Sequence, residues 1–566
     1  MKKVSTQSKP PKTVDSQGQK FHGSQPRGLK SVSSSFSTEG RFGRMFRNAP
    51  IYEHKPENLA ALAKSMIVAA NPKDLNPVEF PLKAGESDNP TIPSGYVYFG
   101  QFIDHDITFD PASSLQKQND PDALHNFRTP RFDLDSLYGR GPADQPYLYM
   151  NSDSPLPHPV FGFDRRGIMF LIDEQTDRNE ADLPRNANGR ALIGDPRNDE
   201  NIIVSQLHLV FLKFHNKMVE LVFKQSGLTG NDLFLEAQRM VRWHYQWVIF
   251  HDFLPRILDG KTDESTIQPS EILNDILIRE KYTTINGGIG TFLKTNLRFY
   301  HWHNTPFLPV EFSVAAYRFG HSMVRSSYFI NDFVRQENKN MPIPIFSASR
   351  NPLENLNGFR PLPTAWGIGW KYFFEIETDF PPQSSFKIDT KISNPLSNLP
   401  SISEMPNLAH RNLMRGFQMN LPSGQSIAKA MGIHPLSDDE LQLSKRGAPD
   451  FEGDAPLWFY ILREAEILAK GIHLGPVGGR IVGEVFAGLL AGDPFSWFNI
   501  EPNWRPTLSV NGKFKMSDLI RFTVGESVND MTSQQPPQAA SASGILTNWR
   551  EVFPQNNSDS STFIPK

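Results

Sequence analysis

The chain has no cysteine among its 566 residues. This absence excludes disulfides, thiolate-bound metals, iron–sulfur clusters and thiol catalysis. A positive excess is missing too, because 58 Lys and Arg residues stand against 61 Asp and Glu, for a formal net charge of −3. Nucleic-acid-binding proteins usually carry such an excess, so no nucleic-acid partner is expected.

Long apolar runs are missing as well. No stretch of the sequence approaches the roughly 20 apolar residues of a membrane-spanning helix, so no membrane span is expected. Met1-Lys2-Lys3 has the charge of a signal-peptide start, but no apolar segment follows it, which predicts that a classical signal peptide is absent. These absences favour a cytoplasmic location, with secretion that needs no leader as the alternative.

The remaining composition predicts one large domain. Residues 1–45 are rich in Ser, Lys, Gln and Gly and are predicted to form a polar extension, either disordered or packed on the body. Residues 46–555 show no repeat and no linker, so we predict a single domain there, followed by a tail over 556–566. Hydrophobic residues make up 38% of the chain, which is enough for a large core.

Helical periodicity dominates that domain. Apolar residues recur at three- and four-residue spacing over about 201–223, 231–253, 309–324 and 456–470. Strand-like alternation is short and scattered, and the 46 prolines are spread along the chain, which is typical of helices joined by irregular loops. The expected fold is therefore mainly α, with long irregular loops and few short strands.

The segment Phe99–Asp106 is the most informative in the chain. In a helix, Gln101 and His105 would share one face, with Asp104 at its edge. Asp106 would lie about 200° from Asp104 and point the other way. An isolated histidine is most simply interpreted as a buried structural residue. Here that interpretation must also explain why so many polar groups crowd an aromatic segment, so we treat it as a candidate site.

Three later segments complete a pattern. Gly194–Asn201 precedes the predicted helix at 201–223 and brings Arg197 and Glu200 close, although its acidic residues could also simply cap that helix. In Ala316–Met323, His321 follows a glycine that would permit close approach of a large flat group. The fourth segment is Arg411–Gly416.

In order and spacing, these four segments resemble the animal-type haem peroxidases, the superfamily of myeloperoxidase, lactoperoxidase and the cyclooxygenases, over roughly residues 50–550. The resemblance implies a single large helical haem-peroxidase domain that buries haem b. It also implies that His105 is the distal histidine, with Gln101 beside it and Arg197 as the distal arginine. A bacterial member is expected from the missing cysteines.

On the other side of the haem, the resemblance implies that His321 is the proximal iron ligand. Asn412 would accept a hydrogen bond from the other N–H of that imidazole, which fixes the ring and makes it a stronger ligand. Arg415 and Arg318 would pair with the haem propionates.

Two acids match the residues that form ester bonds to haem in mammalian members, namely Asp104 and Glu200. The resemblance therefore implies that ester-linked haem is possible here. Asn201 stands where myeloperoxidase has a methionine that forms a sulfonium link. That link is excluded, and easy chloride oxidation is not expected.

A calcium site is implied beside the distal histidine. Asp106 is similar to the calcium ligand of the family, and the other ligands would be Thr129, Arg131 through its carbonyl, Asp133 and Asp135. Carboxylates, a hydroxyl and a carbonyl suit a hard cation. The family has a serine at the position of Asp135, and the extra charge is compatible with calcium. The alternative is a solvated acidic loop.

The implied function is reduction of hydrogen peroxide with oxidation of a phenol, a halide or a pseudohalide. Peroxide would bind iron opposite His321, His105 would act as general base and then acid, and Arg197 would stabilise negative charge on the leaving oxygen. One alternative is a non-catalytic haem- or calcium-binding scaffold. The intact set of candidate residues argues against it.

The other alternative is a fatty-acid dioxygenase of the same superfamily. Those enzymes carry a tyrosine three residues before the proximal histidine, where this chain has Arg318, with Tyr317 one position earlier. Tyr300 precedes His303 by three residues, but His303 lies outside the predicted helix, so His321 is the preferred ligand. Three other histidine groups lack the spacing of a zinc site and are interpreted as structural: His208 with His215, His301 with His303, and His251.

Overall fold

The computed structural model describes residues 40–68, 85–109, 125–150, 166–175, 180–259, 271–283, 289–400, 402, 405–446, 451, 454–510 and 512–524. The chain divides after Thr38, and all described residues belong to the unit Glu39–Lys566. The predicted tail at 556–566 and residues 1–39 of the predicted extension lie outside the described residues. Residues 40–43 already form a strand of the body.

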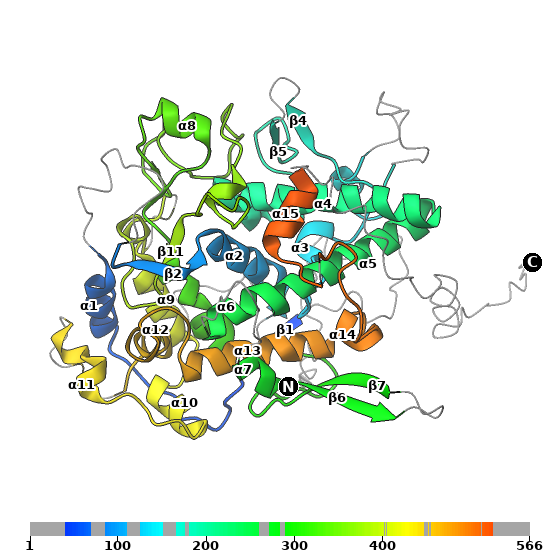
Figure 1. The fold of residues 1–566 in the computed structure, drawn as a ribbon. Coiled ribbons are helices and arrows are strands. Elements are labelled where there is room, and N and C mark those ends of the chain that lie inside the picture. The colour runs from blue at the N-terminus through cyan, green and yellow to red at the C-terminus, as the bar shows by residue number, and fades with distance from the viewer. Residues whose placement is uncertain are drawn as a thin grey trace, which may run out of the picture. The chain divides into compact units, whose positions relative to one another are not determined.

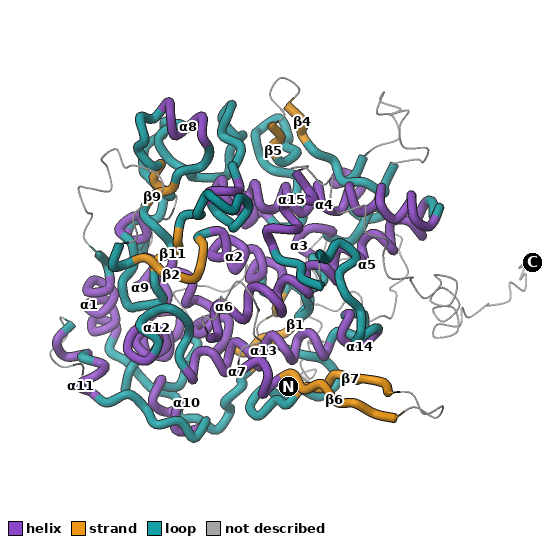
Figure 2. Tube along the Cα trace, viewed as in Figure 1, coloured by secondary structure: helices purple, strands orange, loops and turns teal. Residues whose placement is uncertain are grey.

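The predicted mainly α fold is confirmed (Figures 1 and 2). The α-helices are α1 (Pro56–Met66), α2 (Gly95–Ile107), α3 (Asp135–Tyr138), α4 (Ile202–Ser226), α5 (Gly230–Val248), α6 (Leu254–Asp259), α7 (Glu271–Ile276), α8 (Asp332–Glu337), α9 (Leu408–Gln418), α10 (Gly424–Ala430), α11 (Asp438–Leu441), α12 (Leu457–Leu468), α13 (Pro476–Gly492), α14 (Trp497–Ile500) and α15 (Met516–Val524). Among the described residues, no helix is long and apolar enough to cross a membrane.

Strands are short and serve as local ties. They are β1 (Gly40–Gly43), β2 (Asp88–Pro93), β3 (His125–Asn126), β4 (Asp173–Gln175), β5 (Glu180–Asp182), β6 (Leu277–Thr283), β7 (Ile289–Thr295), β8 (Leu308–Pro309), β9 (Ser327–Tyr328), β10 (Ile343–Pro344) and β11 (Ser384–Phe386). Strand β1 pairs antiparallel with β3 and parallel with β8, and the other sheets within the described ranges are antiparallel pairs: β2–β11, β4–β5, β6–β7 and β9–β10.

Helix α4 agrees with the predicted helix at 201–223 and shows why it begins and ends where it does. The side chain of Asn201 accepts a hydrogen bond from the Val204 N–H (2.9 Å), which caps the first turn. Gly227 ends the helix in the left-handed conformation at φ 68°, which suits a residue without a Cβ atom.

Two other predicted helices change type along their length. The helix predicted over 231–253 becomes a π-turn, η5 (Ile249–Phe253). Pro255 explains this change, because it lacks an N–H and its ring would collide with a carbonyl of a regular α-helix. The helix predicted over 309–324 is a π-turn, η6 (Glu311–Ala315), followed by a 3₁₀ segment, η7 (Ala316–Met323).

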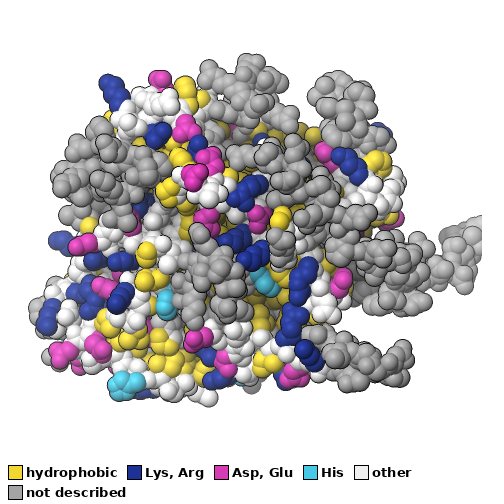
Figure 3. Space-filling model, in the orientation of Figure 1, with side chains coloured by type: hydrophobic (Ala, Val, Ile, Leu, Met, Phe, Trp, Pro, Cys, Tyr) yellow, Lys and Arg dark blue, Asp and Glu magenta, His cyan; other side chains and the backbone are white. Residues whose placement is uncertain are grey.

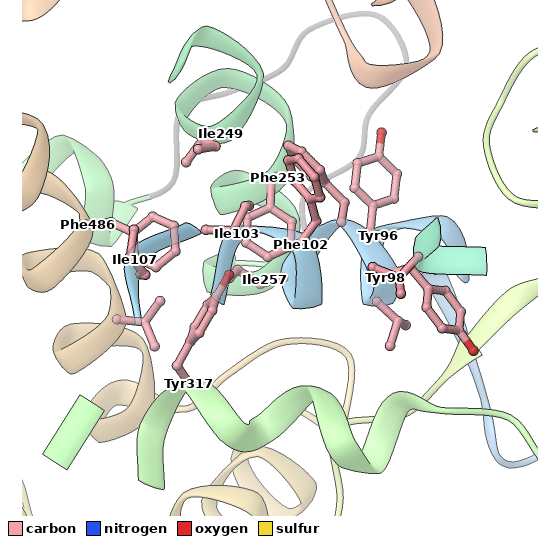
Figure 4. Packing of buried hydrophobic residues seen from close by; sticks show 14 of the residues in the cluster. Tyr96, Tyr98, Phe102, Ile103, Ile107, Ile249, Phe253, Ile257, Tyr317 and Phe486 are labelled. Carbon is pink, nitrogen blue, oxygen red and sulfur yellow. The ribbon is translucent and has the colours of Figure 1, made fainter. Parts of the chain in front are cut away.

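Helix α2 lies in the interior, where its aromatic side chains pack against neighbouring elements (Figure 4). Phe102 and Ile103 are fully buried. Phe102 stacks on Phe211 of α4 with 4.7 Å between ring centroids, and Figure 4 shows Phe253 of η5 beside the same part of α2. Burying one such side chain stabilises the fold by about 1.5–3 kcal/mol. From the opposite side, Tyr317 of η7 points toward α2, and its hydroxyl donates to the Gly100 carbonyl (3.2 Å). Helix α2 and segment η7 are therefore in direct contact.

On the face drawn in Figure 3, Lys and Arg side chains and Asp and Glu side chains both occur across the surface. This mixture agrees with the small formal net charge of −3.

One buried carboxyl predicts a pH-dependent stability. Glu464 of α12 accepts hydrogen bonds from the N–H groups of Val477 (3.0 Å) and Gly478 (3.2 Å) at the start of α13. Burial nevertheless raises its pKa to about 7. The folded-state pKa thus lies above the unfolded value, so this group stabilises the fold below about pH 4.5 and loses that contribution as the pH rises to about 7.

We expect Glu464→Gln to remove this pH-dependent loss of folding stability, which is at most about 3 kcal/mol. Unfolding with urea between pH 4 and 8 would measure it. Glu466→Gln on the same helix is the matched control, because Arg463 and Thr390 hold the pKa of Glu466 below its usual value despite burial. That variant should lose stability above pH 4.5 instead. Parallel pH profiles for wild type and Glu464→Gln would contradict the prediction.

Candidate active site

The end of α2 and the turn before α4 are held together by side chains. The Gln101 amide donates to the Glu200 carboxylate (2.8 Å) and accepts from Asn201 (3.3 Å). Glu200 follows a 3₁₀ turn, η4 (Pro196–Asp199), which the Asp195 side chain caps by accepting from the Arg197 N–H. The structure thus brings Gln101 next to the Arg197–Glu200 segment.

His105 is buried and neutral. Its Nδ1 lies 2.8 Å from Oδ1 of Asn198 in η4. Burial first, and then the Arg197 charge, lowers the pKa of His105 to about 3. A ring that stays neutral across the ordinary pH range and is held through Nδ1 can accept a proton at Nε2, as a general base requires.

Arg197 lies against the C-terminal end of α2. Its Nη2 donates to the carbonyl oxygens of His105 (3.0 Å) and Thr108, and Nε and Nη2 both donate to Asp195. Carbonyls at a helix C-terminus attract a cation. Burial favours the neutral form of Asp195, but Arg197 and Arg128 outweigh it and hold its pKa below the usual range. Nε and Nη2 are thus occupied, and contact of Arg197 with a reacting oxygen stays a prediction.

Asp104 and Glu200 both keep part of their surface accessible. Burial raises the pKa of each, whereas Arg197 lowers both. Arg318 of η7 also lowers the pKa of Asp104, so a charge on η7 acts on a carboxyl group of α2. This interaction supports a shared space between the two segments.

His321 lies in η7 and is held by Asn412 of α9, with 2.7 Å between Nδ1 and the amide Nδ2. Arg318 donates to the amide Oδ1 (2.7 Å). Because a guanidinium has only donors, the amide oxygen turns toward it and Asn412 donates to His321. The sequence predicted the opposite direction, in which Asn412 accepts. That direction requires the amide to turn over, which becomes favourable when another acceptor takes Arg318.

Arg318, which lies near His321, is subject to the charges of two further guanidinium groups. Burial lowers the pKa of Arg318 to about 10, Asp104 opposes this, and the charges of Arg415 and Arg411 lower it further. A ligand with carboxylates would relieve this cost. The chemistry of these residues therefore fits an anionic cofactor beside His321.

Gly320, next to His321 in η7, has open space on one side. Burial lowers the pKa of His321 to about 3, yet its side chain keeps part of its surface accessible. Among the described residues, a Cβ atom on Gly320 would meet nothing within 4 Å beyond its chain neighbours. The open side of Gly320 agrees with the interpretation of this glycine as a place for close approach.

The residues of the dioxygenase alternative lie elsewhere. Tyr317 stacks on Phe312 with 4.9 Å between ring centroids, and its hydroxyl donates to Gly100. His303 is exposed in the loop before β8. Tyr300 donates its hydroxyl to the Phe307 carbonyl (2.6 Å). None of these three residues takes the position three before His321, which Arg318 occupies.

Acidic residues converge at the C-terminal end of α2. Oxygens of Asp106, Asp133 and Asp135 all lie within 4.8 Å of one another, the only such metal-ligand group among the described residues. Thr129 donates its hydroxyl to Asp133 (2.8 Å), and Arg131 is buried beside them. Burial and the neighbouring carboxylates raise the pKa of Asp106, and burial raises that of Asp135 to about 7 although Arg128 opposes it. A cation would offset the repulsion that crowding creates.

The remaining histidines have ordinary partners. His215 contacts the Tyr138 hydroxyl through Nδ1 (3.0 Å) and the Ile168 carbonyl through Nε2 (2.9 Å). His251 stacks on Trp247 with 3.6 Å between centroids. His208, which the sequence paired with His215, instead lies 3.0 Å from Asn198.

Asn198 and Asp195 were missed by the sequence reasoning, although both lie within three residues of Arg197. The signal that could have found Asn198 is its place in the same short turn as Arg197 and Glu200. Its contact with His105 joins positions 93 apart in the chain, which no local pattern reveals.

Comparison with known proteins agrees with this architecture. A family model described as animal haem peroxidase matches residues 112–364. A peroxidase-like protein from Margaritifera margaritifera is 28% identical over 275 residues, which are 40% of this chain and 31% of that protein. The chain spans between 11% and 40% of the length of the curated relatives that it matches.

Solved structures share the fold. Peroxidase A from Dictyostelium discoideum superposes with a TM-score of 0.55 at 16% identity, over 88% of this chain and 94% of that one. A fatty acid α-dioxygenase from Oryza sativa, in a crystal structure with palmitic acid, gives a TM-score of 0.53 at 15% identity, over 83% and 76%. The family match, the curated peroxidase relatives and the shared fold all support a likeness of this chain to the peroxidase–cyclooxygenase superfamily.

Proposed function

We propose that the protein is a haem-dependent peroxidase that reduces hydrogen peroxide and oxidises a phenol, a halide or a pseudohalide. The observation that carries this proposal is a pair of histidines on two contacting segments. His105 of α2 is buried, neutral and held through Nδ1, and His321 of η7 is held through Nδ1 and keeps part of its surface accessible. The Tyr317–Gly100 hydrogen bond joins the two segments.

Haem fits the residues around His321. His321 would bind the iron through Nε2 once the Asn412 amide has turned over, because its oxygen then accepts from Nδ1–H and the Nε2 lone pair is free. Arg318 and Arg415 would bind the two carboxylates, which relieves the mutual repulsion of these guanidinium groups. When bound, haem supplies the redox chemistry that the side chains of a cysteine-free protein lack.

The distal residues would manage protons. His105 Nε2 would take the proton from hydrogen peroxide and return it to the departing oxygen, so that the oxygen leaves as water. The positive charge of Arg197 near His105 keeps the ring neutral between turnovers, because it lowers the pKa of His105 together with burial. Gln101, held by Glu200, would orient a bound water or anion on the same face of α2.

Asp104 and Glu200 are the proposed sites of ester bonds to haem. Burial raises the pKa of both carboxyl groups, which suits partly buried acids. Asn201 donates to Gln101 and has no sulfur, so a sulfonium link is excluded.

The test is the ultraviolet–visible spectrum of the purified chain with haem supplied, before and after one equivalent of hydrogen peroxide. We expect a Soret band that shifts with peroxide and returns when a phenol is added. Extraction of the same samples with acidified solvent shows whether haem is covalently held. A haem spectrum indifferent to peroxide would support the scaffold alternative, and oxygen uptake with a fatty acid but no reaction with peroxide would support the dioxygenase.

We also propose that Asp106, Asp133 and Asp135 bind calcium, with Thr129 and the Arg131 carbonyl completing the ligands. The convergence of these three carboxylates supports a cation, and so do the raised pKa values of Asp106 and Asp135. Calcium at a hundredfold excess over its Kd should raise the Tm by about 3–5 °C.

Chelation followed by differential scanning calorimetry measures this effect. Asp133→Asn should lower the Tm in calcium and abolish the response to the chelator. Asp439→Asn, a change of the same chemistry at an exposed position of α11, is the control and should keep the full response. A wild-type Tm that chelation leaves unchanged would contradict the proposed site.

A further inference from the structure

A buried polar chain runs from His105 to a second histidine that has no role in the scheme above. His105 Nδ1 lies 2.8 Å from Asn198 Oδ1, and Asn198 Nδ2 lies 3.0 Å from Nδ1 of His208 in α4. The exposed fractions are 6% for His105 and zero for Asn198 and His208. Helix α2, turn η4 and helix α4 each contribute one member.

The Asn198 amide determines which atoms donate and which accept in the His105–Asn198–His208 network. An amide oxygen only accepts, so the proton of neutral His105 is on Nδ1. An amide NH₂ only donates, so Nδ1 of His208 carries the lone pair and its proton is on Nε2. Both rings are buried, which disfavours a second proton, so each neutral ring carries one proton. This arrangement leaves the lone pair of His105 on Nε2.

Turning the amide over would reverse both histidines. Asn198 would then donate to His105 Nδ1, and the His105 proton would move to Nε2. In that state Nε2 has no lone pair and cannot take a proton. Only the first orientation keeps the His105–Asn198 hydrogen bond when His105 holds a second proton, because Nδ1–H still donates to the amide oxygen. The orientation of one amide therefore decides whether His105 can act as a base.

We propose that Asn198 and His208 are positioning residues that hold His105 in the tautomer with a free Nε2 lone pair. His208 acts through Asn198, since its Nδ1 accepts from the amide NH₂ and so fixes which end of the amide faces His105. The inference deepens the proposed peroxidase function and rests on it. A purely structural role would satisfy the same buried groups but would not select a tautomer.

The first experiment reads the tautomer directly. The full chain is labelled with ¹⁵N-histidine, and nitrogen NMR spectra are recorded without haem and with haem in the diamagnetic ferrous carbon monoxide form. The shift of a ring nitrogen reports whether it carries a proton, and His105→Gln and His208→Asn assign the signals by their loss. We expect Nδ1–H for His105 and Nε2–H for His208.

A matched pair of variants tests the role of His208. His208→Asn keeps an acceptor near the position of Nδ1, whereas His208→Leu has similar size and no acceptor. We expect His105 to keep the Nδ1–H tautomer in the first variant and to populate Nε2–H in the second. Asn198→Leu should populate Nε2–H as well. With tautomer loss, the rate of reaction with peroxide should fall by about 10- to 100-fold, as for other residues that orient a catalytic histidine.

Each outcome decides the inference. An Nε2–H signal for His105 in wild type, or an unchanged tautomer in both His208→Leu and Asn198→Leu, would overturn it. Equal rate losses in His208→Asn and His208→Leu with an unchanged tautomer would assign these residues a structural role. The NMR spectra do not depend on turnover. A protein that shows the expected tautomers but does not react with peroxide would therefore contradict the proposed peroxidase function and leave the tautomer assignment intact.

Discussion

His321→Ala is expected to abolish stable haem binding. The imidazole is the only histidine on η7, its Nδ1 is already engaged by Asn412 at 2.7 Å, and its side chain keeps part of its surface accessible next to Gly320. Without this ligand the cofactor would be held only by its carboxylates and apolar contacts. Titration of haem into the variant, followed by the Soret band, measures the loss.

Rescue separates ligation from folding in this experiment. His321→Gly with added imidazole should recover the Soret band, because free imidazole can replace the missing ligand. His303→Ala removes an exposed histidine and is the matched control, with normal haem binding expected. The assignment of His321 fails if His321→Ala binds haem normally while His303→Ala does not.

His105→Gln is expected to keep haem and to slow the reaction with peroxide by about 10²- to 10⁴-fold. The physical reason is the loss of a neutral base whose pKa is lowered to about 3, so that its lone pair is available across the ordinary pH range. Glutamine retains a polar side chain of similar reach but cannot take a proton. Stopped-flow measurement of the Soret change against peroxide concentration gives the rate.

The control for this second variant is His301→Gln, which makes the same change at an exposed position. It should react as fast as the wild type. Unchanged rates in His105→Gln would remove the base from the scheme and support the non-catalytic scaffold. A variant that also loses haem would point to a wider disturbance, which circular dichroism of the helices would reveal.

The helices were predictable where apolar spacing and caps agree. For α4, the spacing predicted 201–223, and the Asn201 cap and Gly227 place the observed helix at Ile202–Ser226. The segment 309–324 was predicted as one regular helix and is a π-turn followed by a 3₁₀ segment. Apolar spacing cannot separate these helix types, because they differ in backbone hydrogen bonding and not in which residues are apolar. At the break, Arg318 Nε donates to the Ser313 carbonyl (3.1 Å).

The candidate site was predictable as a set of residue types but not as a network. Segment order pointed to His105, Arg197, His321 and Asn412, and the structure brings His321 to Asn412 and Arg197 to the His105 carbonyl. The direction of the Asn412 hydrogen bond came out opposite to the prediction, because Arg318 takes the amide oxygen.

By itself, the sequence determined the chemistry that is absent and the residue types that are present. It excluded thiol chemistry through the missing cysteines, predicted a mainly α fold through apolar spacing, and identified the histidines of the candidate site. Only the tertiary structure decided which of these groups are neutral and which atoms they offer. The reason is that desolvation and hydrogen-bond direction depend on contacts between residues far apart in the chain. His105 and Asn198 are 93 positions apart, and His321 and Asn412 are 91 apart. Only folding brings such pairs together and removes water from them.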